Sequence, residues 1–395
     1  MAILKLQRRF SVRGESVYKI VSSRYFVNKD ANLIEVSNEI VKHRESDCIG
    51  VIDDNENAIG ILSRKKIFDL LGKSYGKEIL SFRNVEFLTE ECMTFQIEEN
   101  ILNVVDRIKE RLEINEPTYF LVKYDKDKFA GIFSNIDLMI YLSKILQKDI
   151  LLASNLQRSI IKEEEVVEEN FFSLIFCSNM MKEIGGDFYF FKKHEDRYIF
   201  SLCDVSGKGI SASLLTAFLR GVVVAYNFSL GLEGLISLIN TELHSVFELQ
   251  KFVTGIFIDF HFREGNMEIY DMGHSLIYLL RNNKLMRLKT NRNNLPLGLS
   301  SVMKIVPNSF GLEKDDLLIL LTDGIIEQTN FRGEELGEEA VLRMVKIYQN
   351  NSLKEIKNNL INGVFTFKEK EPQHDDFSFS LLKYHGNSSS SIVSL

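Results

Sequence analysis

The chain has 395 residues, of which 45% are hydrophobic and 26% charged, a composition typical of soluble globular proteins and a length that favours two or three domains. Its net charge of -7 argues against a nucleic-acid-binding protein, and no apolar run approaches the roughly 18 residues that cross a bilayer. The N-terminus shows no signal-peptide pattern, and the four scattered cysteines predict buried thiols in a reducing cytoplasm.

An internal repeat occupies the first 140 residues. The segment 51–63 recurs as 122–134 at a constant offset of 71 positions. Each copy predicts a strand, a polar turn and a second strand, followed by a helix that begins at Arg64 or at Asn135. Apolar residues spaced by three and four predict a further helix upstream of each hairpin. A helix, a hairpin and a helix therefore occur twice.

This repeat resembles a tandem pair of cystathionine-β-synthase (CBS) domains over residues 16–145. The resemblance implies an adenine-nucleotide site between the copies, formed by a Gly-x-x-Ser/Thr-x-x-Asp segment that the second copy keeps as Gly131, Ser134 and Asp137. The first copy has Lys66 at the Asp position, and a lysine cannot accept hydrogen bonds from ribose. At most one complete nucleotide site is therefore expected. The alternative is that Ser134 and Asp137 simply cap the helix they begin.

A long helix is predicted next, from about residue 138 to 165. A narrow apolar stripe runs along it through Leu142, Leu146, Ile150, Ala153, Leu156 and Ile160. Such a stripe favours pairing with a second helix, so we expect a homodimer; the alternative is an amphipathic helix that lies on its own domain. The acidic run 163–169 predicts a solvated boundary.

Acidic residues mark strand ends in the remaining sequence. The stretch 184–189 predicts a strand with Asp187 at its exit, and the apolar run 198–203 leads into Asp204 and a glycine-rich turn. A third apolar strand ends at Asp323, and the pair Asp375 and Asp376 begins a fourth. Crowded carboxylates repel one another unless a cation or proton neutralises them, which indicates a hard metal ion with oxygen ligands.

Six motifs then occur in a fixed order: Gly-Gly-Asp-Phe-Tyr, Asp-Val-Ser-Gly-Lys-Gly, Asp-Met-Gly-His, Leu-Pro-Leu-Gly, Thr-Asp-Gly-Ile-Ile-Glu and His-Asp-Asp-Phe-Ser. Over residues 155–385 the chain resembles the stage II sporulation protein E type of metal-dependent protein phosphatase, the bacterial branch of the 2C-type serine/threonine phosphatases. The resemblance implies an α+β protein whose catalytic α-β-β-α sandwich has two antiparallel sheets flanked by helices and holds two Mn or Mg ions. Residues 156–161 depart from the family, because they lack its Leu-Pro.

The resemblance also implies roles for individual residues. Asp187 would bind both metals, Asp204 and the carbonyl oxygen of Val205 one of them, and Asp323 and Asp375 the other. Asp375 is preferred to Asp376 because the family's acidic-pair motif places the ligand first. Lys208 is interpreted either as a contact for the substrate phosphate or as an exposed turn lysine, and His274 as structural.

The predicted organisation is an N-terminal segment (1–15), a tandem CBS module (16–145), a linker helix (138–165), a phosphatase domain (166–385) and a disordered tail (386–395). The resemblance implies a cytoplasmic phosphatase that uses a metal-activated water on a phosphorylated anti-sigma-factor antagonist, under control of an adenine nucleotide. Neither nucleic acid nor membrane is expected as a partner. Two alternatives are a catalytically inactive nucleotide-sensing scaffold and a phosphohydrolase for small molecules.

Overall fold

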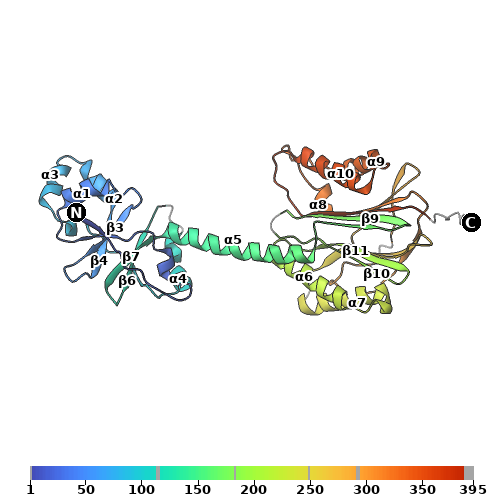
Figure 1. Ribbon diagram of the computed structural model, residues 1–395, viewed down its shortest axis with the longest axis horizontal. Coiled ribbons are helices and arrows are strands. Elements are labelled where there is room, and N and C mark those ends of the chain that lie inside the picture. Colours follow the sequence, from blue (N-terminus) through green and yellow to red (C-terminus); the bar gives the residue numbers. More distant parts are fainter. Residues whose placement is uncertain (1, 113–115, 182–183, 248–249, 291–293, 387–395) are drawn as a thin grey trace, which may run out of the picture. The chain divides into compact units, whose positions relative to one another are not determined.

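The computed structural model describes residues 2–112, 116–181, 184–247, 250–290 and 294–386. These residues belong to two compact units, Met1–Lys148 and Asp149–Leu395, whose helices and strands are labelled in Figure 1. The predicted tail lies outside the described residues, apart from Gly386.

The first unit contains the predicted repeat. Each copy has a hairpin followed directly by a helix: β3 (Cys48–Ile52), β4 (Ala58–Ser63) and α2 (Arg64–Leu71), then β6 (Tyr119–Tyr124), β7 (Lys128–Ser134) and α5 (Asn135–Ile160). The helices upstream are α1 (Leu33–Ile40) and α4 (Ile101–Leu112). Their apolar residues are buried in the cores of the two copies, so this part of the prediction is confirmed.

Short elements complete the two sheets of this unit. In each copy a short strand lies parallel to the first hairpin strand, β2 (Tyr25–Asn28) beside β3 and β5 (Thr94–Gln96) beside β6. The remaining elements are β1 (Ile3–Lys5), α3 (Gly76–Phe82) and the 3-10 turns Val17–Ile20 and Val85–Leu88.

Two antiparallel sheets form the centre of the second unit. One has the order β10 (Phe188–His194), β11 (Arg197–Val205), β12 (Val253–His261), β13 (Asn266–Met272) and β16 (Asn308–Gly311). The other has the order β15 (Lys284–Arg287), β14 (Ile277–Arg281), β17 (Leu317–Leu321), β18 (Phe377–Tyr384), β9 (Phe172–Asn179) and β8 (Glu164–Glu168).

Helices cover the outer face of both sheets. Helices α6 (Ile210–Ala225) and α7 (Gly231–Phe247) pack on β11 and β12, whereas α9 (Glu338–Ile347) and α10 (Leu353–Lys368) lie over the second sheet (Figure 1). A 3-10 turn, Phe228–Leu230, precedes α7, and the short α8 (Asp323–Ile326) follows β17. The predicted α-β-β-α sandwich is confirmed.

The packing explains why these strands are apolar on both faces. Side chains of the two sheets meet in the middle, where the ring of Phe176 on β9 stacks on Tyr189 of β10 with centroids 4.6 Å apart. The opposite face of the second sheet packs on α9 and α10 in a separate core. Covering both faces removes the apolar-polar alternation of a half-exposed sheet.

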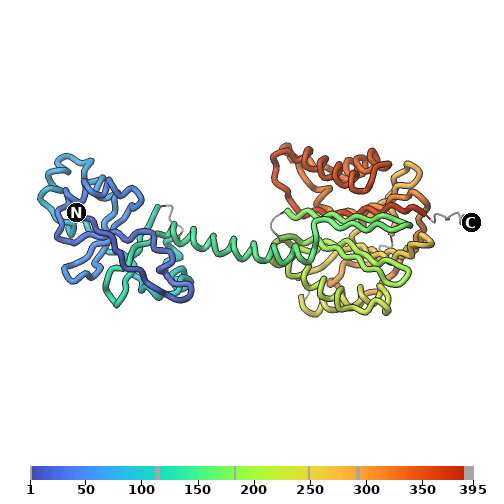
Figure 2. The backbone as a smooth tube through the Cα atoms, in the orientation of Figure 1, coloured from blue at the N-terminus to red at the C-terminus, as the bar shows by residue number. Residues whose placement is uncertain are grey.

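Helix α5 is continuous over 26 residues and crosses the border between the units (Figure 2). Near its end Ser154 and Gln157 are buried, whereas Leu156 of the predicted stripe is 68% exposed. Among the described residues, no single helix is long and apolar enough to cross a membrane; the bent pair 210–225 and 228–247 passes on length and composition only.

Candidate metal centre

The register of the strands brings the predicted acidic residues to one edge of the sandwich. Phe188 pairs with Cys203, so Asp187 immediately before β10 lies beside Asp204 near the end of β11. In the other sheet Leu321 pairs with Phe379, which places Asp323 opposite Phe377, two residues after Asp375. One expectation was wrong: Asp187 precedes its strand rather than ending it. Asp187 and Asp204 still lie at the same edge of the sheet, because the start of one antiparallel strand lies beside the end of its neighbour.

Glycine is required in the loop before Asp187. A Cβ atom at Gly185 would lie 2.7 Å from Oδ2 of Asp376, and one at Gly186 would lie 3.0 Å from the carbonyl oxygen of Val205. Both distances are shorter than ordinary contacts between atoms. The missing side chains therefore allow this loop to pack against the turn that carries Asp204 and Val205.

Burial and neighbouring charges make both carboxylates of the first sheet costly to ionise. Burial raises the pKa of Asp187 well above its usual range, and the nearby charge of Asp204 raises it further. Burial also raises the pKa of Asp204 to about 7, with contributions from Asp323, Asp375 and Asp376. A bound cation would relieve this repulsion.

Asp375 and Asp376 have different surroundings. Asp376 is buried, and its two carboxylate oxygens accept hydrogen bonds from the backbone N–H groups of Met181 and Gly186, both at 2.6 Å. Asp375 instead pairs through Oδ2 with Nζ of Lys208 at 2.7 Å. Both oxygens of Asp376 are therefore occupied by backbone hydrogen bonds, whereas Asp375 pairs with the side chain of Lys208. This difference favours Asp375 as the ligand.

Lys208 lies at this edge and has two partners there. Its ammonium group also donates to the carbonyl oxygen of His374 at 3.0 Å, and the hydrogen bond to Asp375 raises the pKa of Lys208. Among the described residues, no other cation forms an ion pair with these carboxylates.

Three residues that the sequence did not single out support the acidic cluster. The hydroxyl of Thr322 donates to Oδ2 of Asp187 at 2.9 Å. The carboxyl of Glu327 lies close enough to Asp204 to raise its pKa. Gln157 of α5 accepts from the N–H of Gly185 at 3.0 Å and donates to the carbonyl oxygen of the same residue at 2.7 Å.

His274 connects the two sheets next to the cluster. Its Nε2 lies 2.7 Å from the carbonyl oxygen of Leu321, and its Nδ1 lies 3.1 Å from the hydroxyl of Thr254, which pairs with Asp204. Burial lowers the pKa of His274. The neutral ring donates from Nε2 and accepts at Nδ1, which agrees with a structural role.

The donor set fits a hard divalent cation by its chemistry. Carboxylate oxygens and carbonyl oxygens such as that of Val205 are the ligands that Mg and Mn prefer, and the raised pKa values of Asp187 and Asp204 reflect burial first and neighbouring negative charge second. Among the described residues, no three His, Cys, Asp or Glu side chains converge on a single point. The fit is therefore one of ligand type and not of a preformed arrangement. The residues that would hold the metals are Asp187, Asp204, Val205, Asp323 and Asp375, and Asp375 would first have to leave Lys208.

The predicted nucleotide residues form a helix cap. Oδ2 of Asp137 accepts hydrogen bonds from the N–H and the hydroxyl of Ser134, both at 2.7 Å, and from the hydroxyl of Ser22 at 2.7 Å. Gly131 contacts Val21 and Ser23, where a Cβ would not fit. A nucleotide site at this position stays a prediction.

A cleft of about 680 Å³ in the same unit is lined by residues of both copies. Ser63 and Arg64 from the first copy and Arg111 and Tyr119 from the second are among the residues that line it, and Gly131, Ser134 and Asp137 are not. Lys66, which replaces the family's Asp, pairs with Glu90 at 3.5 Å.

The fold of the second unit is that of the 2C-type phosphatases. It resembles the solved SiaA-PP2C domain of Pseudomonas aeruginosa with a TM-score of 0.51 and 16% identity, covering 61% of this chain and 98% of that domain.

The particular family follows from the sequence match. Residues 194–385 match the family described as Stage II sporulation protein E, and residues 17–73 match the CBS domain. The chain therefore carries a stage II sporulation protein E-type phosphatase domain behind an N-terminal CBS domain, as the motifs predicted.

Two curated relatives come from Bacillus subtilis (strain 168). Phosphoserine phosphatase RsbU is 21% identical over 241 residues, which is 60% of this chain and 70% of that protein. Phosphoserine phosphatase RsbP is 22% identical over 211 residues, covering 52% of this chain and 50% of that protein. The chain thus spans only about half the length of the second relative.

Proposed function

We propose that this protein is a Mn- or Mg-dependent serine/threonine phosphatase that dephosphorylates a regulatory phosphoprotein, an anti-sigma-factor antagonist. Phosphatase is the class to which the domain match and both curated relatives belong. The observation that carries the proposal is the set of carboxylates at one edge of the sandwich, with Lys208 as their cationic neighbour.

The proposed chemistry is hydrolysis by water. Two divalent ions, when bound, supply a hydroxide near neutral pH and neutralise the phosphoryl oxygens. The ions would be held and oriented by Asp187, Asp204, Asp323, Asp375 and the carbonyl oxygen of Val205. Lys208 stays protonated and contacts a phosphate oxygen as a point charge. Thr322 and Gly186 fix the carboxylates of Asp187 and Asp376 through the hydrogen bonds described above.

An inactive nucleotide-sensing scaffold is a weaker proposal for this chain. A scaffold has no need of buried carboxylates that repel one another, yet Asp187 is almost fully buried beside Asp204. Such an arrangement costs stability unless it serves a ligand. A phosphohydrolase for small molecules would need the same metal centre. An assay with both classes of substrate must therefore distinguish it from a protein phosphatase.

We further propose that the N-terminal unit senses an adenine nucleotide and regulates the enzyme through α5. The contact of Gln157 with Gly185, two residues before Asp187, supports this route. A homodimer is proposed from the exposed leucines of the helix, Leu146 and Leu156. A ligand that favours one arrangement of the CBS copies would change the orientation of α5. A cytoplasmic location and a lack of nucleic-acid and membrane partners are proposed with these roles.

The function is tested on the full chain with two substrates side by side. Phosphate release from a phosphorylated anti-sigma-factor antagonist and from p-nitrophenyl phosphate is measured with Mn, with Mg and with excess chelator. We expect metal-dependent release and a much higher kcat/KM on the phosphoprotein. Full activity in chelator would contradict the metal centre, and turnover of the small ester alone would contradict the protein substrate.

The regulatory proposal needs a separate titration. Adenine nucleotides are titrated against phosphatase activity and metal affinity in the parent chain, in Asp137→Ala and in Lys66→Ala, which changes the other copy. If a nucleotide binds and changes neither quantity, regulation through α5 is wrong. A parent-like response of Asp137→Ala would remove Asp137 from the site.

A further inference from the structure

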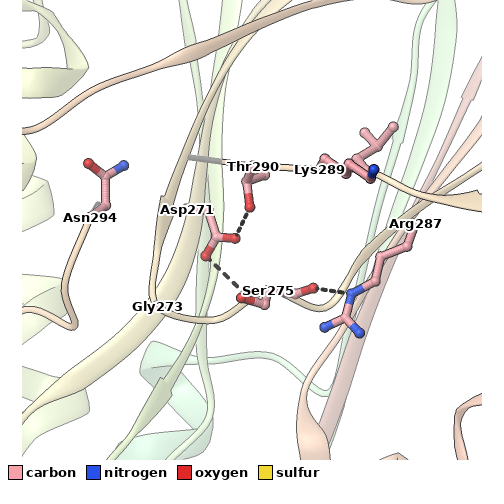
Figure 3. Close-up of a pocket in the computed structure, with 8 residues that line it drawn as sticks. Asp271, Gly273, Ser275, Arg287, Lys289, Thr290 and Asn294 are labelled. Atoms are coloured by element: carbon pink, nitrogen blue, oxygen red, sulfur yellow. Dashed lines mark hydrogen bonds between the residues drawn. The ribbon is translucent and has the colours of Figure 1, made fainter. Parts of the chain in front are cut away.

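A polar cavity of the second unit opens at the edge of the sandwich that carries the carboxylates. Its volume is about 620 Å³. Asp271, Gly273, Ser275, Arg287, Lys289 and Thr290 are among the residues that line it (Figure 3). None of these residues has a role in the centre described above.

The strand register places this cavity beside the metal centre. Ile277 at the start of β14 pairs with Leu320 of β17, and Tyr278 pairs with Arg287 at the end of β15. Adjacent strands lie about 4.8 Å apart, so the backbone of Arg287 is roughly 10 Å across the sheet from Ile319, which lies four residues before Asp323. An extended peptide covers this distance in about three residues.

The walls of the cavity are fixed and polar. The carboxylate of Asp271 accepts hydrogen bonds from the N–H groups of His274 and Ser275 at 2.8 and 3.0 Å and from the hydroxyl of Thr290 at 2.5 Å. Its oxygens are thus occupied by donors from the wall itself. The turn is also anchored to the centre, because His274 binds the carbonyl oxygen of Leu321.

Two cations line one side of this cavity (Figure 3), and one of them, Arg287, also forms an ion pair with Glu338. Arg287 donates from Nε to the carbonyl oxygen of Ser275 at 3.0 Å, and its Nη1 lies 3.5 Å from Glu338. This leaves Nη2 without a hydrogen-bond partner among the described residues. Lys289 is exposed and takes part in none of the ion pairs of the described chain. A planar guanidinium beside an ammonium group is suited to bind a carboxylate.

We propose that this basic cavity, defined by Arg287 and Lys289, binds an acidic side chain of the phosphoprotein substrate about three residues from the phosphorylated serine. The inference rests on the proposed phosphatase function and adds a determinant of specificity to it. The metal centre would act on any phosphomonoester that reaches it, whereas the basic cavity would distinguish substrates by the sequence around the phosphate.

The test uses the full chain with Mn and phosphoserine peptides that differ only in the residue three positions away on either side, which is Asp, Ala or Lys. p-Nitrophenyl phosphate serves as a substrate that cannot reach the cavity. We expect the parent to prefer the Asp peptide over the Ala peptide about tenfold in kcat/KM. Arg287→Ala combined with Lys289→Ala should reduce this ratio to near one. Arg287→Glu combined with Lys289→Glu should shift the preference to the Lys peptide.

Lys284→Ala is the matched control, because Lys284 is exposed on the same hairpin but at its opposite end. Lys289→Glu alone covers the case in which loss of Arg287 disturbs the turn at Ser275. A parent without a preference, a ratio unaffected by these variants, or hydrolysis of the ester but of no peptide would each overturn the cavity's role. A chain that hydrolyses neither class with Mn would overturn the proposed function itself.

Discussion

The buried carboxylate of Asp187 lowers the stability of the free protein and favours the binding of a cation. Burial and the charge of Asp204 raise its pKa, so ionisation at neutral pH opposes folding until a cation binds. We expect Asp187→Asn to lower metal-dependent hydrolysis by at least about a hundredfold. The same variant should unfold at a higher temperature than the parent in chelator, because the amide is neutral.

The measurement is thermal unfolding and phosphate release, each with Mn and with chelator. Asp196→Asn is the control, since Asp196 is exposed and pairs with Arg263 at 3.2 Å far along the strands from the carboxylates. An Asp187→Asn chain that gains as much stability from Mn as the parent would show that Asp187 is not a ligand.

His274 acts at the same scale through the backbone that it holds. Its ring joins Thr254, opposite Asp204, to Leu321, two residues before Asp323. We expect His274→Ala to raise the Mn concentration that gives half-maximal activity by about tenfold, because the two sheets lose their connection. His274→Gln keeps a donor for Leu321 and should be less affected. Equal metal dependence in all three chains would assign His274 to packing alone.

At the scale of elements, the end of α5 is part of the catalytic unit. Gln157 is buried and bonds to both backbone groups of Gly185 and to the hydroxyl of Thr216 on α6 at 2.9 Å. Gln157→Ala leaves these buried groups unpaired and should cost about 1–3 kcal/mol of unfolding free energy. Activity should fall with it, since Gly185 belongs to the loop that positions Asp187. Denaturant unfolding and phosphate release check this, with the exposed Arg158→Ala as control.

The same helix shows how far the sequence could predict the structure. The repeated hairpins and the acidic strand ends were readable, because apolar runs and Asp-Gly turns are local signals. The role of Gln157 was not, because a polar residue on a helix normally indicates a solvent-facing position. Its partners, Gly185 and Thr216, come from distant segments. The position of Asp187 before its strand was missed for a similar reason: a strand's first residue and last residue look alike until its partner is known.

At the scale of the whole molecule, two leucines of the predicted α5 stripe, Leu146 and Leu156, stay exposed within one chain, whereas Leu142 and Ile160 pack on hydrophobic cores. Leu146 and Leu156 are 59% and 68% exposed, and burying such side chains against a second copy is favourable by roughly 1.5–3 kcal/mol each. We expect Leu146→Glu with Leu156→Glu to convert a dimer into a monomer at micromolar concentration. Sedimentation velocity measures this, with the exposed Val302→Glu as control. A parent that sediments as a monomer would exclude the seam.

Because α5 is continuous, a change in its length also changes the rotation of its two ends about the helix axis. Each residue added to an α-helix rotates everything beyond it by about 100° and moves it by about 1.5 Å. One residue inserted between Leu142 and Leu152 would therefore turn Gln157 out of step with the first unit, while seven would bring it back to within about 20°. Regulation should be lost in the first chain and largely regained in the second, as a nucleotide titration of activity would reveal. In α5, rotation about the helix axis would then affect regulation more than translation along it.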